Sequence, residues 1–281
     1  MLGFAFILVI SSATLHALWN FTTKKASGDL SVVYLGLVFA SIVLIPPALV
    51  SVVSNGLTSK AYMFIIATGV VHSFYFLFLS RAYAHGSISV VYPMARGCGV
   101  VGTVVVALVV LRESISMHGT AGIICTSLGI LFVGLKRGDR IDGKKGLIYA
   151  LLVGVTMIFY SIIDKIAVGY VDPVVYILGL FLMSMFCLTP YMLIARRGEL
   201  ANAWRKYRKY SIIIGIGSAI GYLIILFVFR IAQVSYVVAV REVSVAMGAI
   251  LGMTYLGEAR SKKKIVGIGL ILVGLILIRI A

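Results

Sequence analysis

Two arginines lie inside long apolar stretches of this 281-residue chain. Arg96 belongs to the stretch 87–111, and Arg241 belongs to the stretch 234–256. A charge near the middle of a membrane helix costs about 2.5–3.5 kcal/mol on insertion, so such residues mark functional sites by default. A guanidinium group can bind a carboxylate, phosphate or phosphonate through two parallel hydrogen bonds. We therefore expect both arginines to face one central cavity that favours an anionic or zwitterionic solute. The alternative is that each is neutralised by a buried acid, with Glu242 as the obvious partner.

Other polar and aromatic side chains stand three or four residues apart in the apolar stretches. At that spacing they share one face of a helix, as Tyr92 does with Arg96. Together such groups could line a cavity that has a few polar groups among aromatic rings. For each aromatic the alternative is ordinary packing or anchoring at the membrane interface, and for each histidine it is packing. The candidate substrate-binding residues are Arg96, Arg241, Tyr92, His16, Trp19, Asn20, His72, Tyr75 and Tyr160.

Two carboxylates are candidates for carrying a coupling proton, namely Glu242 and Asp164. A carboxylate in a low-dielectric site can exchange a proton near neutral pH, and its charge can then be coupled to solute binding. For Glu242 the alternative is a permanent ion pair with Arg241 or Arg96, which would exclude it as a carrier. Asp164 lies near the end of its apolar stretch, so a solvated carboxylate or a pair with Lys165 is the favoured expectation.

The elements that must position these residues are membrane helices. Hydrophobic residues make up 61% of the chain and charged residues only 12%, about half the share in soluble domains, and the mean hydropathy is +1.10. Each apolar segment is long enough to cross about 30 Å of hydrocarbon as a helix, and the alternation of a membrane barrel is absent. The segments are roughly 2–22, 30–54, 61–81, 87–111, 117–135, 145–168, 172–195, 211–231, 234–256 and 263–280.

The composition disfavours several other classes of protein. The net charge is +16, but the basic residues lie mostly in short loops, where they set topology and contact anionic lipid, so no nucleic-acid partner is expected. No HExxH, DDxxD or Walker A pattern occurs, and all four histidines precede the GIGSAIG stretch, which disfavours a membrane serine protease. The three cysteines lie in apolar segments without metal-ligand spacing, so neither a metal nor a cofactor is expected.

The two halves of the chain resemble each other. The longest polar connection, KRGDRIDGKK, leaves five apolar segments on either side and predicts repeats at 1–138 and 139–281. Because five spans is an odd number, the second copy enters the membrane from the opposite side. The fold class expected is an all-α polytopic membrane protein of ten transmembrane helices in two inverted five-helix repeats, as in secondary transporters. An offset of 145 aligns Arg96 with Arg241, Glu113 with Glu258, Gly122 with Gly267 and Gly129 with Gly274, and an offset of 141 aligns Trp19 with Tyr160.

Three motifs carry a resemblance to a known family. They are HALWNFTTKKA near the start, and two copies of an apolar helix that ends in Glu before a Gly-rich helix, VVLRES…GTAGIICTSLGILFVG and TYLGEA…VGIGLILVGLILI. In these motifs and in its duplicated layout the chain resembles the EamA-type members of the drug/metabolite transporter superfamily. The resemblance implies a ten-helix carrier of small metabolites. The first copy has Arg112 before Glu113, where the second has the more typical Gly257 before Glu258.

The sequence therefore predicts a secondary active transporter rather than an enzyme. It would move a small polar metabolite, such as an amino acid or a phosphonate, by alternating access across a prokaryotic cytoplasmic (inner) membrane, driven by the proton gradient or by exchange. The expected partners are the solute and membrane lipid, and the chain would act as a monomer or a homodimer. The rival functions are a lipid-linked solute flippase component and a membrane enzyme with an unrecognised site.

The distribution of basic residues gives a prediction about orientation. The connections that follow the odd-numbered segments hold 18 of the 25 Lys and Arg residues, and the remaining loops and ends hold five. By the positive-inside rule both termini are then outside, whereas members of the family that the chain resembles usually have both termini inside. We expect a fusion of alkaline phosphatase at Ala281 to be active and a fusion of green fluorescent protein there to be dark. The reverse pair of results would restore the orientation usual in the family.

Overall fold

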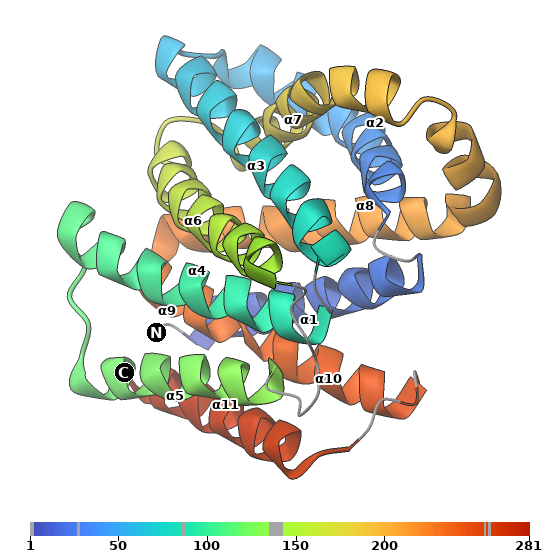
Figure 1. The fold of residues 1–281 in the computed structure, drawn as a ribbon. Coiled ribbons are helices and arrows are strands. Elements are labelled where there is room, and N and C mark those ends of the chain that lie inside the picture. The colour runs from blue at the N-terminus through green and yellow to red at the C-terminus, as the bar shows by residue number, and fades with distance from the viewer. Residues whose placement is uncertain (1–2, 27–28, 86–87, 135–142, 256, 258–259) are drawn as a thin grey trace.

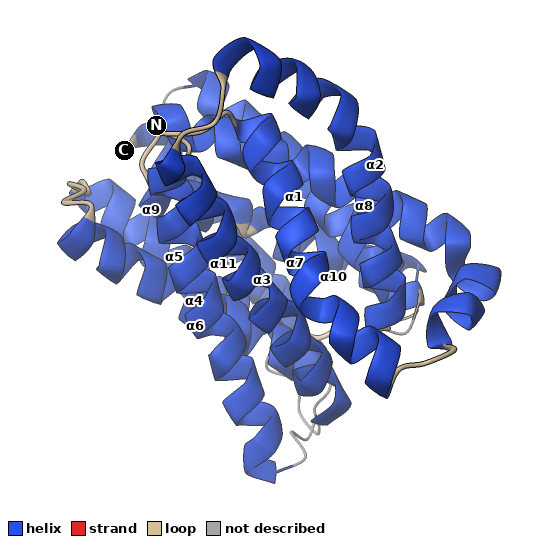
Figure 2. Ribbon diagram, turned by 90° about the horizontal axis from the view of Figure 1, so that it is seen from above, coloured by secondary structure: helices blue, strands red, loops and turns tan. Residues whose placement is uncertain are grey.

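In the computed structural model, every regular element of the described residues is an α-helix (Figures 1 and 2). The residues described are 3–26, 29–85, 88–134, 143–255, 257 and 260–281. The helices are α1 (Gly3–Lys25), α2 (Leu30–Asn55), α3 (Ser59–His85), α4 (Ile88–Val110), α5 (Met117–Gly134), α6 (Gly143–Ala167), α7 (Pro173–Ala195), α8 (Glu199–Ile231), α9 (Val234–Arg241), α10 (Val243–Tyr255) and α11 (Lys262–Ile280).

All ten predicted apolar segments form helices. Within the described residues, nine helical spans are long and apolar enough to cross a membrane, with α9 and α10 together counting as one. The tenth segment is α11, whose apolar stretch is flanked by three lysines at its start and Arg279 near its end. Flanking basic side chains of this kind reach out of the hydrocarbon to the interface. The chain is thus a multi-pass integral membrane protein.

Two features of the helices were not predicted. The ninth segment is interrupted at Glu242, which separates α9 from α10. The eighth helix begins at Glu199, before its apolar stretch, and its backbone leaves helical geometry at Tyr207. The interruption at Glu242 falls in the middle of a membrane span, where freed backbone groups are tolerated only in contact with protein or a cavity.

The extensive contacts between helices occur in corresponding pairs: when each helix of a contact is replaced by its counterpart in the other half, the second contact is also present. Helix α3 packs on α6, and α8, the counterpart of α3, packs on α1, the counterpart of α6. Likewise α4 packs on α6, and its counterparts α9 and α10 pack on α1. In the same way, α2 contacts α8 and α7 contacts α3. The ends of the chain also meet, because Arg279 of α11 lies beside Gly3 of α1 (Figures 1 and 2).

The most extensive contact between two helices joins α5 to α11 at the lower edge of Figure 1. A Cβ atom added at Gly122 would lie 2.8 Å from the carbonyl oxygen of Gly274, and one added at Gly267 would lie 2.7 Å from that of Gly129. Since the offset of 145 aligns Gly122 with Gly267 and Gly129 with Gly274, the two contacts are the same contact seen from either half. Small residues let the backbones approach where lipid supplies no hydrophobic drive for pairing.

Short segments after α4 and α10 also correspond between the halves. Arg112 has φ of 53° and Gly257 has φ of 65°, so the first half holds an arginine in the left-handed conformation that suits glycine. The carboxylate of Glu113 accepts hydrogen bonds from the backbone amides of Val234 and Ser235, at 2.6 and 3.1 Å. Glu113 thus caps the start of α9. Its counterpart Glu258 lies outside the described residues.

The glycine contact predicts a difference between two variants of one helix. Gly267→Ala should lower the free energy of unfolding by about 1–3 kcal/mol, because the added methyl group meets the backbone of α5. Gly269→Ala is the matched control, since a Cβ at Gly269 meets nothing within 4 Å. Thermal unfolding of the purified variants in detergent measures the difference. Equal melting temperatures would contradict the close contact of α5 and α11.

Candidate functional site

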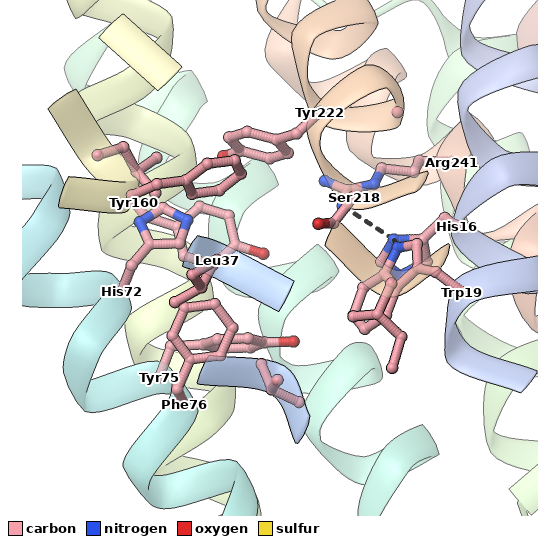
Figure 3. A pocket seen from close by; sticks show the side chains of 15 residues that line it. His16, Trp19, Leu37, His72, Tyr75, Phe76, Tyr160, Ser218, Tyr222 and Arg241 are labelled. Carbon is pink, nitrogen blue, oxygen red and sulfur yellow. Dashed lines mark hydrogen bonds between the residues drawn. The ribbon is translucent and has the colours of Figure 1, made fainter. Parts of the chain in front are cut away.

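A cavity lies in the centre of the bundle, between α1, α2, α3, α6, α7, α8 and α9 (Figure 3). It contains about 680 Å³ of space that no atom fills, part of it open to the surroundings. In Figure 3, His16, Trp19 and Arg241 lie on one side, and the rings of His72, Tyr75, Phe76 and Tyr160 lie on the other. The lining residues are His16, Trp19, Val33, Leu37, His72, Tyr75, Phe76, Tyr160, Leu180, Phe181, Ile214, Ser218, Gly221, Tyr222 and Arg241.

The structure brings six of the nine predicted binding residues to this cavity. Of the remaining three, Asn20 donates its side-chain amide to the carbonyl oxygen of His16 at 2.7 Å, so it is used within α1. Arg96 lies behind the lining. The side chain of Tyr92 lies outside the described residues. The six that line the cavity are His16, Trp19, His72, Tyr75, Tyr160 and Arg241.

The two arginines differ in their surroundings, contrary to the expectation that both face the cavity. Nη1 of Arg96 lies 2.9 Å from Oε1 of Glu242, and both side chains are at most 3% exposed. The other terminal nitrogen of Arg96 contacts Nε2 of His16. Arg96 is thus held between α9–α10 and α1, and Glu242 is in an ion pair with Arg96 rather than with Arg241. For Arg96 the structure agrees with the alternative, neutralisation by the buried acid Glu242.

Arg241 has hydrogen-bonding capacity that the protein does not use. No protein group in the described structure accepts from its buried Nε. Its guanidinium lies over the ring of Tyr222, 5.3 Å from the ring centre, and its Nη2 is 3.3 Å from Nδ1 of His16. The cavity wall therefore carries a cation whose direct contacts in the described structure are a cation–π contact and one long hydrogen bond.

His16 lies among donors only. Arg96 approaches its Nε2, and both Trp19, at 3.1 Å, and Arg241 approach its Nδ1. A neutral imidazole accepts at one nitrogen and donates at the other, so it cannot accept from all three groups. Donors thus exceed acceptors around His16, and an anionic group entering the cavity would supply the acceptors.

The opposite side of the cavity is aromatic. His72 stacks on Tyr160 with ring centres 4.4 Å apart, and Tyr75 meets Tyr160 edge to face at 5.8 Å. Nδ1 of His72 is 2.9 Å from the carbonyl oxygen of Thr68, so this nitrogen carries the hydrogen. Aromatic faces attract apolar groups and also ammonium groups. This side of the cavity therefore suits the apolar or cationic part of a solute.

Asp164 lies next to the aromatic side and is fully buried. Its Oδ1 accepts from Thr68 Oγ1 and from the Tyr176 hydroxyl, both at 2.6 Å, and its Oδ2 accepts from the Tyr222 hydroxyl. Lys165 points to the carbonyl oxygens at the end of α8 instead. The expectation of a solvated or Lys165-paired carboxylate is wrong, because consecutive residues of a helix point about 100° apart.

Four polar or aromatic lining residues were missed, although the repeat contained the signal for two of them; the four are Phe76, Phe181, Ser218 and Tyr222. An offset of 146 places His72 on Ser218 and Phe76 on Tyr222. Both positions of α8 line the cavity opposite their counterparts of α3. Extending the repeat to the third segment of each half would have found Ser218 and Tyr222. Phe76 follows Tyr75 directly in α3, and its own spacing gave no separate signal.

Comparisons with known proteins agree with this architecture. The sequence model of the EamA-like transporter family matches residues 3–135 and again residues 144–280. A solved structure titled "Crystal structure of protein" is similar at a TM-score of 0.78 and 14% identity, over 98% of this chain and 97% of that one. At that identity the likeness shows the fold alone. A comparison with curated proteins gives no match.

The different surroundings of the arginines predict different effects on stability. Arg96→Ala should lower the free energy of unfolding by about 3–5 kcal/mol, because it leaves Glu242 buried and unpaired. The double variant Arg96→Met/Glu242→Leu should recover most of the loss, since the pair is replaced by apolar groups. Arg241→Ala should unfold close to the wild type. Thermal unfolding in detergent distinguishes the variants, and equal losses for Arg96→Ala and Arg241→Ala would refute the assignment.

Proposed function

The chain belongs to the EamA-like transporter family, and on that premise we propose that it is a secondary active transporter of a small anionic or zwitterionic metabolite. An amino acid or a phosphonate is the kind of solute that fits. The membrane crossed is the cytoplasmic membrane of a prokaryote. The transport function is inferred from the family, and the class of solute is inferred from the residues that line the cavity.

The observation that carries the proposal is Arg241 at the cavity wall with unused donors. A carboxylate or phosphonate can take two parallel hydrogen bonds from its guanidinium group. The indole N–H of Trp19 and the ring of His16 lie beside it and add polar partners. The aromatic side would hold the remainder of the solute, including an ammonium group if the solute is a zwitterion.

We propose alternating access of two inverted repeats, 1–138 and 139–281, as the mechanism of transport. The paired helix contacts and the reciprocal glycine contacts of α5 with α11 support a two-fold relation between the repeats. Arg241 ends α9 at the interruption of the ninth span and lines the cavity, which supports a solute site between the repeats, as in inverted-repeat transporters. Rocking of one group of helices against the other would open the cavity to each side in turn.

A thermal-shift screen of the purified protein tests the proposal, because a ligand that binds the native state raises the melting temperature. At 100 times Kd the stabilisation is about 2.7 kcal/mol. The probes are L-alanine, 2-aminoethylphosphonate, uridine and glucose. We expect a shift with at least one of the first two and none with the uncharged uridine or glucose. A shift with glucose or uridine alone would refute the proposed solute class.

Variants of Arg241 connect the screen to the site. Arg241→Ala should abolish both the shift and the uptake of the active probe into vesicles, while the protein still folds. Arg241→Lys should restore little, since a point charge cannot form the bidentate contact. The control is Arg197→Ala, which removes an exposed arginine outside the cavity. Full uptake by Arg241→Ala would remove Arg241 from the site.

A further inference from the structure

Asp164 is a buried carboxylate without a countercharge in contact. It lies in α6 and is 0% exposed, and no ion pair joins it to a basic side chain within the described part of the chain. Its partners are three hydroxyl groups, contributed by α3, α7 and α8. An ionised carboxylate in a membrane interior is costly even when it is hydrogen-bonded, and such residues line proton pathways in transporters.

The hydroxyl shell can accommodate Asp164 in either protonation state. A hydroxyl group donates one hydrogen bond and can accept two, and its hydrogen rotates to suit. The ionised carboxylate accepts from Thr68, Tyr176 and Tyr222 as observed. Once protonated, it could donate to one of these oxygens, whose own hydrogen would turn away. No buried group loses a charge partner when Asp164 is neutral.

Glu242 is in the opposite situation. Its partner Arg96 can only donate and is always charged, so a proton on Glu242 would leave a buried guanidinium without its anion. Of the two candidate coupling residues, Glu242 is thus the one whose protonation would disrupt an ion pair.

Two chains of contacts run from Asp164 to the cavity. The Tyr222 hydroxyl donates to Asp164, and the ring of Tyr222 lies under Arg241 at the cavity wall. Thr68 donates to Asp164, and its Oγ1 is 3.1 Å from Nδ1 of His72, which also lines the cavity. The titratable groups that interact with Asp164 from the surrounding helices are His72 (α3), Tyr160 (α6), Tyr176 (α7) and Tyr222 (α8). Arg241 (α9) in turn interacts with His72, Tyr160 and Tyr222.

We propose that Asp164 is the proton-binding site that couples solute movement to the proton gradient, with Tyr222 and His72 transmitting its charge to the cavity. The inference rests on the proposed transport function. One proton binds a carboxylate oxygen of Asp164 while the site is open to one side, and the charge changes from −1 to 0. The same proton leaves to the other side after the rearrangement, so no other reactant is needed. Protonation of Asp164 reverses its hydrogen bond with the Tyr222 hydroxyl. This reversal changes the contact of the Tyr222 ring with the guanidinium group of Arg241.

Infrared difference spectra test the protonation without any solute. Between about pH 5 and about pH 9, the wild type should gain the carbonyl band of a protonated carboxylic acid at the acidic end. The band should be absent in Asp164→Asn and unchanged in Asp172→Asn. Asp172 is a matched control, because it caps α7 through the amide of Val174 and asparagine also caps helices. A wild type without the band, or a band that survives in Asp164→Asn, would overturn the proposal.

Fluorescence of Trp19 tests the transmission to the cavity. The chain has two tryptophans, so in a Trp204→Phe background the emission reports on Trp19 at the cavity wall. We expect this emission to change over the same pH range. In Tyr222→Phe, which keeps the carboxyl group, the infrared band should remain and the fluorescence change should be reduced. An unaltered fluorescence change in both Tyr222→Phe and Asp164→Asn would refute the transmission.

Uptake into vesicles completes the test, with L-alanine or 2-aminoethylphosphonate as the probe. Asp164→Asn should lose accumulation driven by a pH gradient and keep counterflow exchange, whereas Asp172→Asn should keep both. Accumulation by Asp164→Asn at the wild-type level would overturn the proposal. A wild type that shows the band but neither binds nor transports a probe would refute the proposed function and leave the protonation of Asp164 standing.

Discussion

The structure depends on how four ionisable groups are compensated inside a membrane. Arg96 and Glu242 neutralise each other, Asp164 is held by hydroxyl groups, and Arg241 faces a cavity. An uncompensated charge in hydrocarbon costs several kcal/mol, which is comparable to the whole stability of a domain. The ion pair of Arg96 with Glu242, together with His16, connects α1, α4 and the α9–α10 junction. The hydrogen bonds of Asp164 connect α3, α6, α7 and α8. The cavity lies between these two polar clusters.

The repeat explains the scaffold, whereas the site depends on where the two copies have diverged. Arg96 and Arg241 occupy equivalent positions, but Glu242 has Gly97 as its counterpart, so one acid is present for two arginines. The acid pairs with Arg96, and Arg241 is left at the cavity wall. A strictly symmetric chain would have either two neutralised arginines or two unpaired ones. The departure from symmetry therefore leaves a single arginine at the cavity wall.

Much of the fold could be predicted from the sequence, because membrane helices are specified by local composition. All ten apolar segments form helices, and the repeat offsets aligned the glycines at which α5 and α11 meet, but they did not predict that these two helices pack together. The interruption at Glu242 could not be predicted, because its residues are no worse at forming helices than their neighbours. The position of Asp164 in the sequence suggested a surface carboxylate, since distance from a segment end does not show which face a residue takes. The position of both arginines within apolar segments could be read from the sequence. Which arginine pairs with Glu242 depends on how the helices pack, which the sequence does not show.

The arrangement of the polar clusters indicates where the bundle can move. Within each cluster, short hydrogen bonds or an ion pair join several helices. Between the two groups of helices, the guanidinium of Arg241 lies over Tyr222, a contact worth about 0.5–2 kcal/mol, and Ser12 Oγ of α1 donates to the carbonyl oxygen of Gly221 of α8 at 2.7 Å. Where α4 meets α6, the contact is apolar and passes close to Gly99 and Gly154, so the surfaces can slide without breaking hydrogen bonds. A solute anion that binds the guanidinium of Arg241 would compete with its contact to the ring of Tyr222 and would weaken that link between the two groups of helices. In the proposed mechanism, binding would then favour the rearrangement, because the solute substitutes for the contact it breaks.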